Sequence, residues 1–149
     1  MIHDARKMNE AIDAQNFGRD WEARRAFERQ FRIDEKNAYA ARLNADDLLA
    51  PGTHATECVG SDRYAYEVVS HTTFKSGKKK GMVKTATFRE LDAKRTDDNG
   101  LSESQSYDYT SNPENREMVA ESRWDAAGNF KSLGGFIVGR ARKYSDPSF

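Results

Sequence analysis

The chain has one cysteine, three prolines and no long apolar run among its 149 residues. With Cys58 alone, an internal disulfide and a zinc site made of several cysteines are both excluded. No stretch approaches the roughly 20 apolar residues that a membrane-spanning helix needs. The charged start, residues 1–7, lacks the apolar segment of a secretory signal peptide. We therefore expect an unprocessed, water-soluble chain.

An excess of charge of either sign is also missing, because 24 basic residues stand against 24 acidic ones. Proteins dedicated to duplex DNA usually carry a clear basic excess, since contacts with phosphates supply most of their affinity. Any contact with nucleic acid must therefore come from a local patch. Hydrophobic residues make up 37% of the chain and aromatic residues 11%, which suffices for one domain with a small core.

The first 50 residues are predicted to form a helical arm. Charges of both signs are dense there, and Gly18 is the only glycine in this part of the chain. Asp4 and Asp20 are predicted to cap two helices separated by Gly18. Asp34 is predicted to cap a third, short helix.

Phe27 and Phe31 lie four residues apart and therefore share one face of the second predicted helix. We favour the interpretation that this face packs on a neighbouring helix or on the rest of the protein. The alternative is a face that binds a partner. The arm is too polar to stand alone, so we expect its apolar side chains to be buried against the rest of the protein or a second chain. They are Trp21, Phe27, Phe31, Tyr39, Leu48 and Leu49.

From residue 51 onwards the pattern changes to short strands. Pro51 and Gly52 interrupt the helical pattern, and turn signals follow at short intervals. Six strands are predicted, over residues 54–59, 64–72, 82–90, 105–110, 118–124 and 136–140. Short strands with hairpin connections and no helix between them indicate an antiparallel sheet that closes. The expected fold class is therefore α+β, with a helical arm over 1–50 and a small antiparallel β-barrel, SH3-like or OB-like, over 51–149. A two-layer meander is the alternative.

Two of these predicted strands flank a lysine-rich segment, which indicates a β-hairpin with a basic tip. Gly77 and Gly81 can adopt the positive φ angles of tight turns. We favour a solvated tip that keeps the sheet edge soluble. The alternative is contact with an anionic partner, either an acidic protein surface or a nucleic-acid backbone, without reading of sequence. The lysines concerned are Lys75, Lys78, Lys79, Lys80 and Lys84.

An acidic segment follows the hairpin, but it lacks the residue alternation of a calcium loop, and turn formation explains it. It comprises Asp92, Asp97, Asp98, Asn99 and Glu103. His54 and Cys58 share a face of a predicted strand, yet a cysteine nucleophile also needs a third, orienting group. No motif for phosphate binding, a nucleophilic serine or a zinc protease occurs. We therefore predict no catalytic, cofactor-binding or metal-binding residues, and a protein that is not an enzyme.

Four strings of residues carry a family resemblance. They are Ser61-Asp-Arg-Tyr-Ala-Tyr-Glu-Val-Val69, Lys75-Ser-Gly-Lys78, Lys94-Arg-Thr-Asp-Asp-Asn-Gly-Leu-Ser-Glu-Ser-Gln-Ser-Tyr-Asp-Tyr109 and Tyr144-Ser-Asp-Pro-Ser-Phe149. In this order, over residues 57–149, they resemble a family of small proteins encoded by tailed bacteriophages and prophages. The resemblance does not cover the first 50 residues, and around 78–88 this chain is longer and more basic. The family has no established activity, so the resemblance lends no catalytic residues.

A phage setting implies a binding protein that works in the cytoplasm of the infected bacterial host. The first expectation is a non-enzymatic inhibitor or modulator of a host protein or protein complex, such as a defence complex. One alternative is a nucleic-acid-binding accessory protein that uses the hairpin of residues 75–84. Another is a minor structural phage protein that self-associates. No membrane partner and no cofactor are expected, and the oligomeric state is left open.

Overall fold

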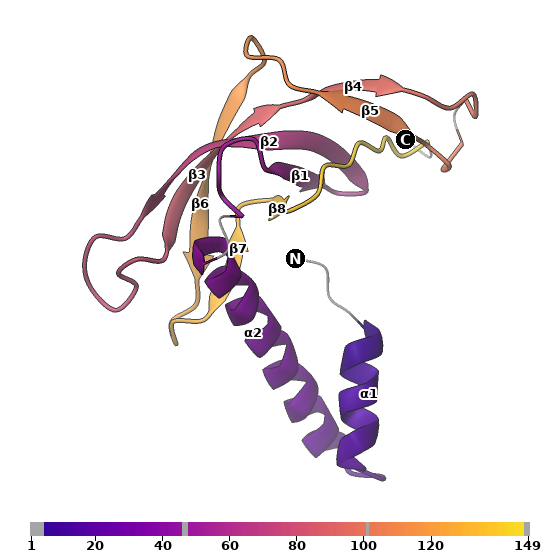
Figure 1. Ribbon diagram of the computed structural model, residues 1–149. Coiled ribbons are helices and arrows are strands. Elements are labelled where there is room, and N and C mark those ends of the chain that lie inside the picture. The colour runs from indigo at the N-terminus through magenta and orange to yellow at the C-terminus, as the bar shows by residue number, and fades with distance from the viewer. Residues whose placement is uncertain (1–4, 46–47, 101, 148–149) are drawn as a thin grey trace.

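The computed structural model describes residues 5–45, 48–100 and 102–147 (Figure 1). Over these residues, two helices precede eight strands. The helices are α1 (Ala5–Gln15) and α2 (Trp21–Ala45). The strands are β1 (His54–Val59), β2 (Asp62–Thr73), β3 (Val83–Glu90), β4 (Asp92–Arg95), β5 (Tyr107–Thr110), β6 (Glu117–Trp124), β7 (Phe130–Leu133) and β8 (Phe136–Val138). Among the described residues, no helix is long and apolar enough to cross a membrane.

Six strands close into an antiparallel barrel in the order β1-β2-β3-β6-β7-β8. Pairing of β1 with β8 completes the ring. The remaining two strands, β4 and β5, pair only with each other and form a hairpin beside the barrel (Figure 1). The predicted α+β class, with an N-terminal helical arm and a small antiparallel barrel, is confirmed.

Aromatic side chains fill the interior of the barrel. The ring of Phe88 stacks on that of Phe136, with centroids 4.1 Å apart and planes 9° from parallel. Tyr66 meets Phe136 edge-on at 5.0 Å. Burying each such side chain stabilises a fold by about 2–3 kcal/mol. The interior is therefore packed core, and a partner must be met on the outer surface.

The C-terminal turns of α2 pack on the barrel, as expected of the arm. Tyr39 and Leu43 belong to the barrel's core cluster, and Leu49 joins it just beyond the helix. The Tyr39 hydroxyl accepts a hydrogen bond from the Val138 N–H at 2.9 Å. The Asn37 side chain accepts one from the Phe130 N–H, also at 2.9 Å. These contacts hold α2 against β7 and β8, while its N-terminal part and α1 project away from the barrel (Figure 1).

The predicted third helix is wrong, because α2 runs unbroken from Trp21 to Ala45. Asp34 lies in its middle and accepts a hydrogen bond from the Gln30 side chain at 2.8 Å, one turn earlier. No glycine or proline between residues 19 and 50 interrupts the helix. The Asp20 cap is confirmed, because its carboxylate accepts the Ala23 N–H at 3.0 Å. The Asp4 cap lies outside the described residues.

Two strands of the structure, β4 and β7, were not predicted, and the predicted strand over residues 105–110 pairs outside the barrel. β4 and β7 are only four residues long, and Lys131 and Ser132 break the apolar pattern of β7. The predicted strand over residues 105–110 shortens to β5 and leaves the barrel to pair with β4. The chain leaves the barrel at Leu91. This residue is buried, and its N–H donates to the Ala65 carbonyl at 2.9 Å. The change in chain direction at Leu91 therefore places β5 beside the barrel and not within it.

Candidate functional site

The lysine-rich hairpin is confirmed, and its loop is internally hydrogen-bonded. The Phe74 N–H donates to the Met82 carbonyl at 2.9 Å, and the Gly81 N–H donates to the Phe74 carbonyl at 2.9 Å. Gly77 and Gly81 have φ angles of 82° and 84°, the left-handed values that a residue with a Cβ rarely adopts. The loop therefore presents its lysines from a defined backbone.

Lys79 differs from the other lysines of this hairpin. It is half-buried, with its ammonium 5.8 Å from the Phe74 ring centroid and 5.4 Å from that of Trp124. These cation–π contacts tie the loop to β6. The side chains that remain exposed are Lys75, Lys78, Lys80 and Lys84. Beside Lys78 and Lys79, and lined also by Asp125, lies an open hollow of about 520 Å³.

Phe27 and Phe31 lie where the two helices of the arm meet. Both are half-buried, and their ring centroids are 6.2 Å apart. The Phe17 ring, in the turn between α1 and α2, lies 5.4 Å from that of Phe27. The favoured interpretation of packing on a neighbouring helix agrees with these contacts, so this pair offers only part of its surface to a partner.

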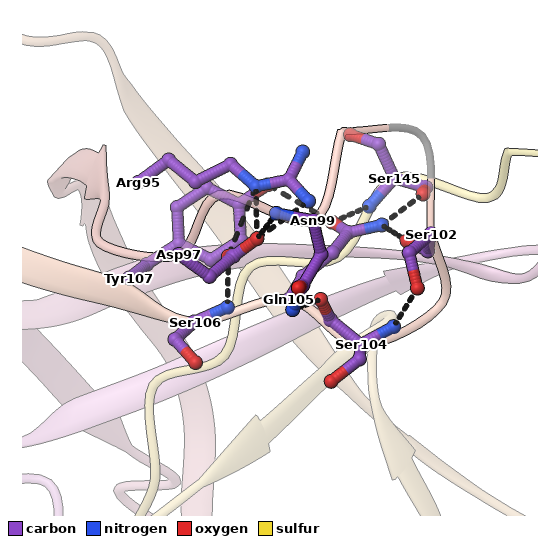
Figure 2. Close-up of polar contacts among 9 residues, drawn as sticks. All are labelled: Arg95, Asp97, Asn99, Ser102, Ser104, Gln105, Ser106, Tyr107 and Ser145. Carbon is purple, nitrogen blue, oxygen red and sulfur yellow. Dashed lines mark hydrogen bonds and ion pairs between the residues drawn. The ribbon is translucent and has the colours of Figure 1, made fainter.

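The acidic segment is organised around Asp97, as Figure 2 shows. Its carboxylate accepts three hydrogen bonds from the Arg95 guanidinium, at 3.1, 3.0 and 2.9 Å. It also accepts the N–H groups of Asn99 at 2.9 Å and Ser106 at 2.7 Å. The bonds from Arg95 and then those from the backbone hold the pKa of Asp97 well below its usual range. The same contact with Asp97 raises the pKa of Arg95.

Gln105 at the end of this loop and Tyr109 on β5 hold the C-terminal segment against the hairpin. The Gln105 amide donates to the Ser145 carbonyl at 2.8 Å, and the Lys143 N–H donates to the Tyr109 hydroxyl at 2.7 Å (Figure 2 shows the Gln105–Ser145 contact). The C-terminal segment thereby ties the β4–β5 hairpin to the barrel. Over the described ranges, no three His, Cys, Asp or Glu side chains are placed to hold a metal ion.

Cys58 and His54 are not brought together as a reactive pair. His54 is exposed, whereas Cys58 is half-buried and lines a hollow of about 260 Å³ beneath α2. No hydrogen bond joins the two side chains within the part of the chain that the structure describes. Cys58 therefore serves as a small packing residue at the edge of the arm's docking site.

Sequence reasoning missed a basic face on α2, made up of Arg25, Arg29, Arg32 and Lys36. Steps of four, three and four residues place these side chains within an arc of about 60° along about 16 Å of helix. All four are exposed, and none makes a hydrogen bond or ion pair with another described residue. The signal was present in the spacing, but the alternation of charge along the chain concealed it.

This basic face continues, toward the N-terminus of α2, the helix surface that docks on the barrel. The same spacing of three and four residues leads from Lys36 to Tyr39 and Leu43, which are buried in the core. In the other direction it leads from Arg25 to Trp21, which was expected to be buried and is instead 64% exposed. The basic face consequently points to the side on which the barrel stands.

A buried polar cluster was also missed. Glu67 is buried in β2, where it accepts a hydrogen bond from the Ser111 hydroxyl and lies 3.8 Å from the Arg89 guanidinium. Arg89 also pairs with Glu117 at 2.7 Å. The cluster crosslinks three neighbouring strands and the segment after β5, so it belongs to the framework of the barrel.

Comparison of this chain with protein-family models, with curated proteins and with solved structures gave no match in any of the three. The arm and the lysine-rich hairpin are therefore the features from which a function is inferred.

Proposed function

We propose that the protein is a non-enzymatic binding protein that holds a macromolecular partner against its helical arm. The observation that carries this proposal is the projection of α1 and most of α2 away from the barrel (Figure 1). Fixing each residue of such a projection costs about 1–2 kcal/mol of backbone entropy, and only its last turns join the core of the barrel. A projecting, exposed and charge-bearing arm is suited to contact with another molecule.

The setting follows from the resemblance of residues 57–149 to phage-encoded proteins. In that setting the partner is a host macromolecule, such as a defence complex, and the protein inhibits or modulates it in the cytoplasm of the infected cell. Inhibition by binding is stoichiometric, because each partner molecule is occupied by one molecule of the protein or of its oligomer.

The test captures the partner from host-cell lysate with the tagged full-length protein and then titrates the activity of that partner with the protein. Inhibition is expected to saturate at a fixed molar ratio, and Trp21→Ala in the arm is expected to weaken it at least tenfold. Val119→Ala is the matched control, because Val119 is 66% exposed on the barrel strand β6. Inactivation of many partner molecules by one molecule of the protein would contradict the proposal, as would equal effects of the two variants.

A second candidate function is that of a nucleic-acid-binding accessory protein using the lysine-rich hairpin. It is favoured by one observation, that Lys75, Lys78 and Lys80 are exposed on a loop anchored by Lys79. Replacing these three lysines with Ser is then expected to weaken binding to any sequence alike. The dependence of log K on log[salt] should become shallower by about 2–3 units. Unchanged binding by this variant would exclude the hairpin as the contact.

A further inference from the structure

The basic face of α2 concentrates positive charge on a chain that has no net charge. Its four cationic groups are exposed and free of ion pairs with other described residues. Three of the four acidic residues of the helix are directed elsewhere or are already engaged, and the fourth, Glu22, lies at the border of this face, one turn before Arg25. Glu28 pairs with Arg24 at 3.2 Å, and Asp34, which accepts the Gln30 amide, lies on the opposite side of the helix. This face therefore attracts anions that the molecule as a whole does not.

Trp21 adds an aromatic surface in line with these charges. Its side chain is 64% exposed, and the Arg24 guanidinium lies 5.8 Å from the ring centroid. An exposed indole beside cationic groups is the combination on which unpaired bases stack while their phosphates are neutralised. A duplex keeps its bases stacked on one another, and an acidic protein surface has no bases, so neither makes full use of Trp21.

The end of the basic face that lies nearest the barrel carries a further cation. Lys131 on β7 and Lys36 on α2 line the same hollow of about 260 Å³. Because the basic face points to the side of the barrel, a strand lying along α2 would reach Lys131 next. The cationic groups thus form one narrow row from Arg25 to the barrel wall, which matches a single phosphate backbone.

We propose that α2 binds a single nucleic-acid strand, with its phosphates along Arg25, Arg29, Arg32 and Lys36 and an unpaired base stacked on Trp21. The inference rests on the proposed binding function and names what the arm touches. The contacts involve phosphates and base faces, so DNA and RNA strands bind alike and sequence is not read.

The test measures fluorescence anisotropy of labelled 16-nucleotide homopolymers, oligo-dT and oligo-rU, with the full-length protein over a range of salt concentrations. A duplex of the same length and poly-glutamate are the competing probes. Both single strands are expected to bind more tightly than the duplex, and poly-glutamate should not displace them. Duplex binding as tight as that of the strands, displacement by poly-glutamate, or no strand binding at low salt overturns the inference.

The variants separate charge from stacking. Changing Arg25, Arg29, Arg32 and Lys36 to Gln together should weaken strand binding at least tenfold. The slope of log K against log[salt] should become shallower by about 3 units, since single strands release about 0.7 counterion per neutralised phosphate. Trp21→Ala should weaken binding by about tenfold with the salt slope unchanged, and Trp21→Phe should restore most of it.

The matched control removes four charges from the lysine-rich hairpin, through Lys75, Lys78, Lys80 and Lys84 changed to Gln. It should bind strands as the wild type does, and equal losses in the two fourfold variants overturn the inference. Circular dichroism verifies that each variant is folded. If strands do not bind but the partner titration still depends on Trp21, this inference fails and the proposed function stands. Inactivation of many partner molecules by one molecule would instead defeat the proposed function.

Discussion

Asp97 joins the two ends of the loop between β4 and β5, because it accepts hydrogen bonds from Arg95 before the loop and from Ser106 after it. An ionised carboxylate accepts all of these bonds, whereas a protonated one must give up at least one of them. The pKa of this group is therefore lower in the folded chain than in the unfolded chain.

The low pKa of Asp97 predicts a pH dependence of stability. A carboxyl group whose pKa falls on folding stabilises the native state above its unfolded pKa of about 3.9, and this contribution is lost as the pH falls below that value. In urea unfolding at pH 7 and pH 3, Asp97→Asn should lose less stability between the two pH values than the wild type. At pH 7, Asp97→Asn should already be less stable than the wild type. Asp98→Asn should lie within about 0.5 kcal/mol of the wild type at pH 7, as usual for exposed sites. Parallel losses in wild type and Asp97→Asn would contradict this assignment.

Tyr39 contributes both a buried ring and a hydrogen-bond acceptor. Its ring lies 6.0 Å from that of Phe130, and its hydroxyl accepts the Val138 N–H. Burial raises the pKa of this phenol, and the bond from Val138 opposes that effect.

Tyr39→Phe is predicted to destabilise the fold by about 1–2 kcal/mol, because the buried Val138 N–H is left without an acceptor. Tyr64→Phe is the control, since the Tyr64 hydroxyl makes no hydrogen bond to a described residue and Lys143 can still lie over the ring. Its free energy of unfolding should change by less than about 0.5 kcal/mol. Equal changes in guanidinium unfolding would show that the hydroxyl of Tyr39 is not the anchor.

Asp20 and Asp34 have different roles although the sequence predicts both as helix caps. Asp20 precedes the helix and satisfies a free N–H of its first turn. Asp34 sits where every backbone group already has a partner inside the helix. The difference lies in the continuity of the helix rather than in the residue type.

Asp20→Ala is predicted to cost about 1 kcal/mol, as is typical of removing an N-cap. Asp34→Ala is predicted to be neutral or to stabilise by up to about 0.5 kcal/mol, because Ala has the higher helix propensity. Thermal unfolding followed at 222 nm checks both variants. A loss of 1 kcal/mol or more in Asp34→Ala would indicate a helix boundary at this position.

The arm and the barrel share one hydrophobic core. Tyr39 and Leu43 from α2 belong to the same buried cluster as Phe88 and Phe136 inside the barrel. Disruption of the barrel therefore removes the surface on which α2 docks, and a helix without that packing is marginal in water.

Phe88→Ala is predicted to destabilise the protein by about 3–5 kcal/mol, since it empties the centre of the aromatic stack. Helical signal at 222 nm and tryptophan fluorescence should then be lost in a single transition at the same denaturant concentration. Two separate transitions, with the helical signal surviving the barrel, would contradict a shared core.

The features that follow from neighbouring residues were predictable from the chain. The positive φ angles at Gly77 and Gly81, the Asp20 cap and the alternation of most barrel strands arise from steric and hydrogen-bonding preferences within a few residues. The class of the fold followed, because six β-patterned runs after a helical segment have few ways to bury their apolar faces.

The features that depend on distant contacts were not predictable in this way. Whether β5 enters the barrel and whether Trp21 is covered both depend on where the barrel places its neighbours. The basic face of α2 could have been read from its spacing as a row of charges. The docking of Tyr39 and Leu43 on the barrel decided the direction in which this row of charges points. Helix periodicity shows only which residues share a face, and a tertiary contact is needed to orient that face relative to the rest of the protein.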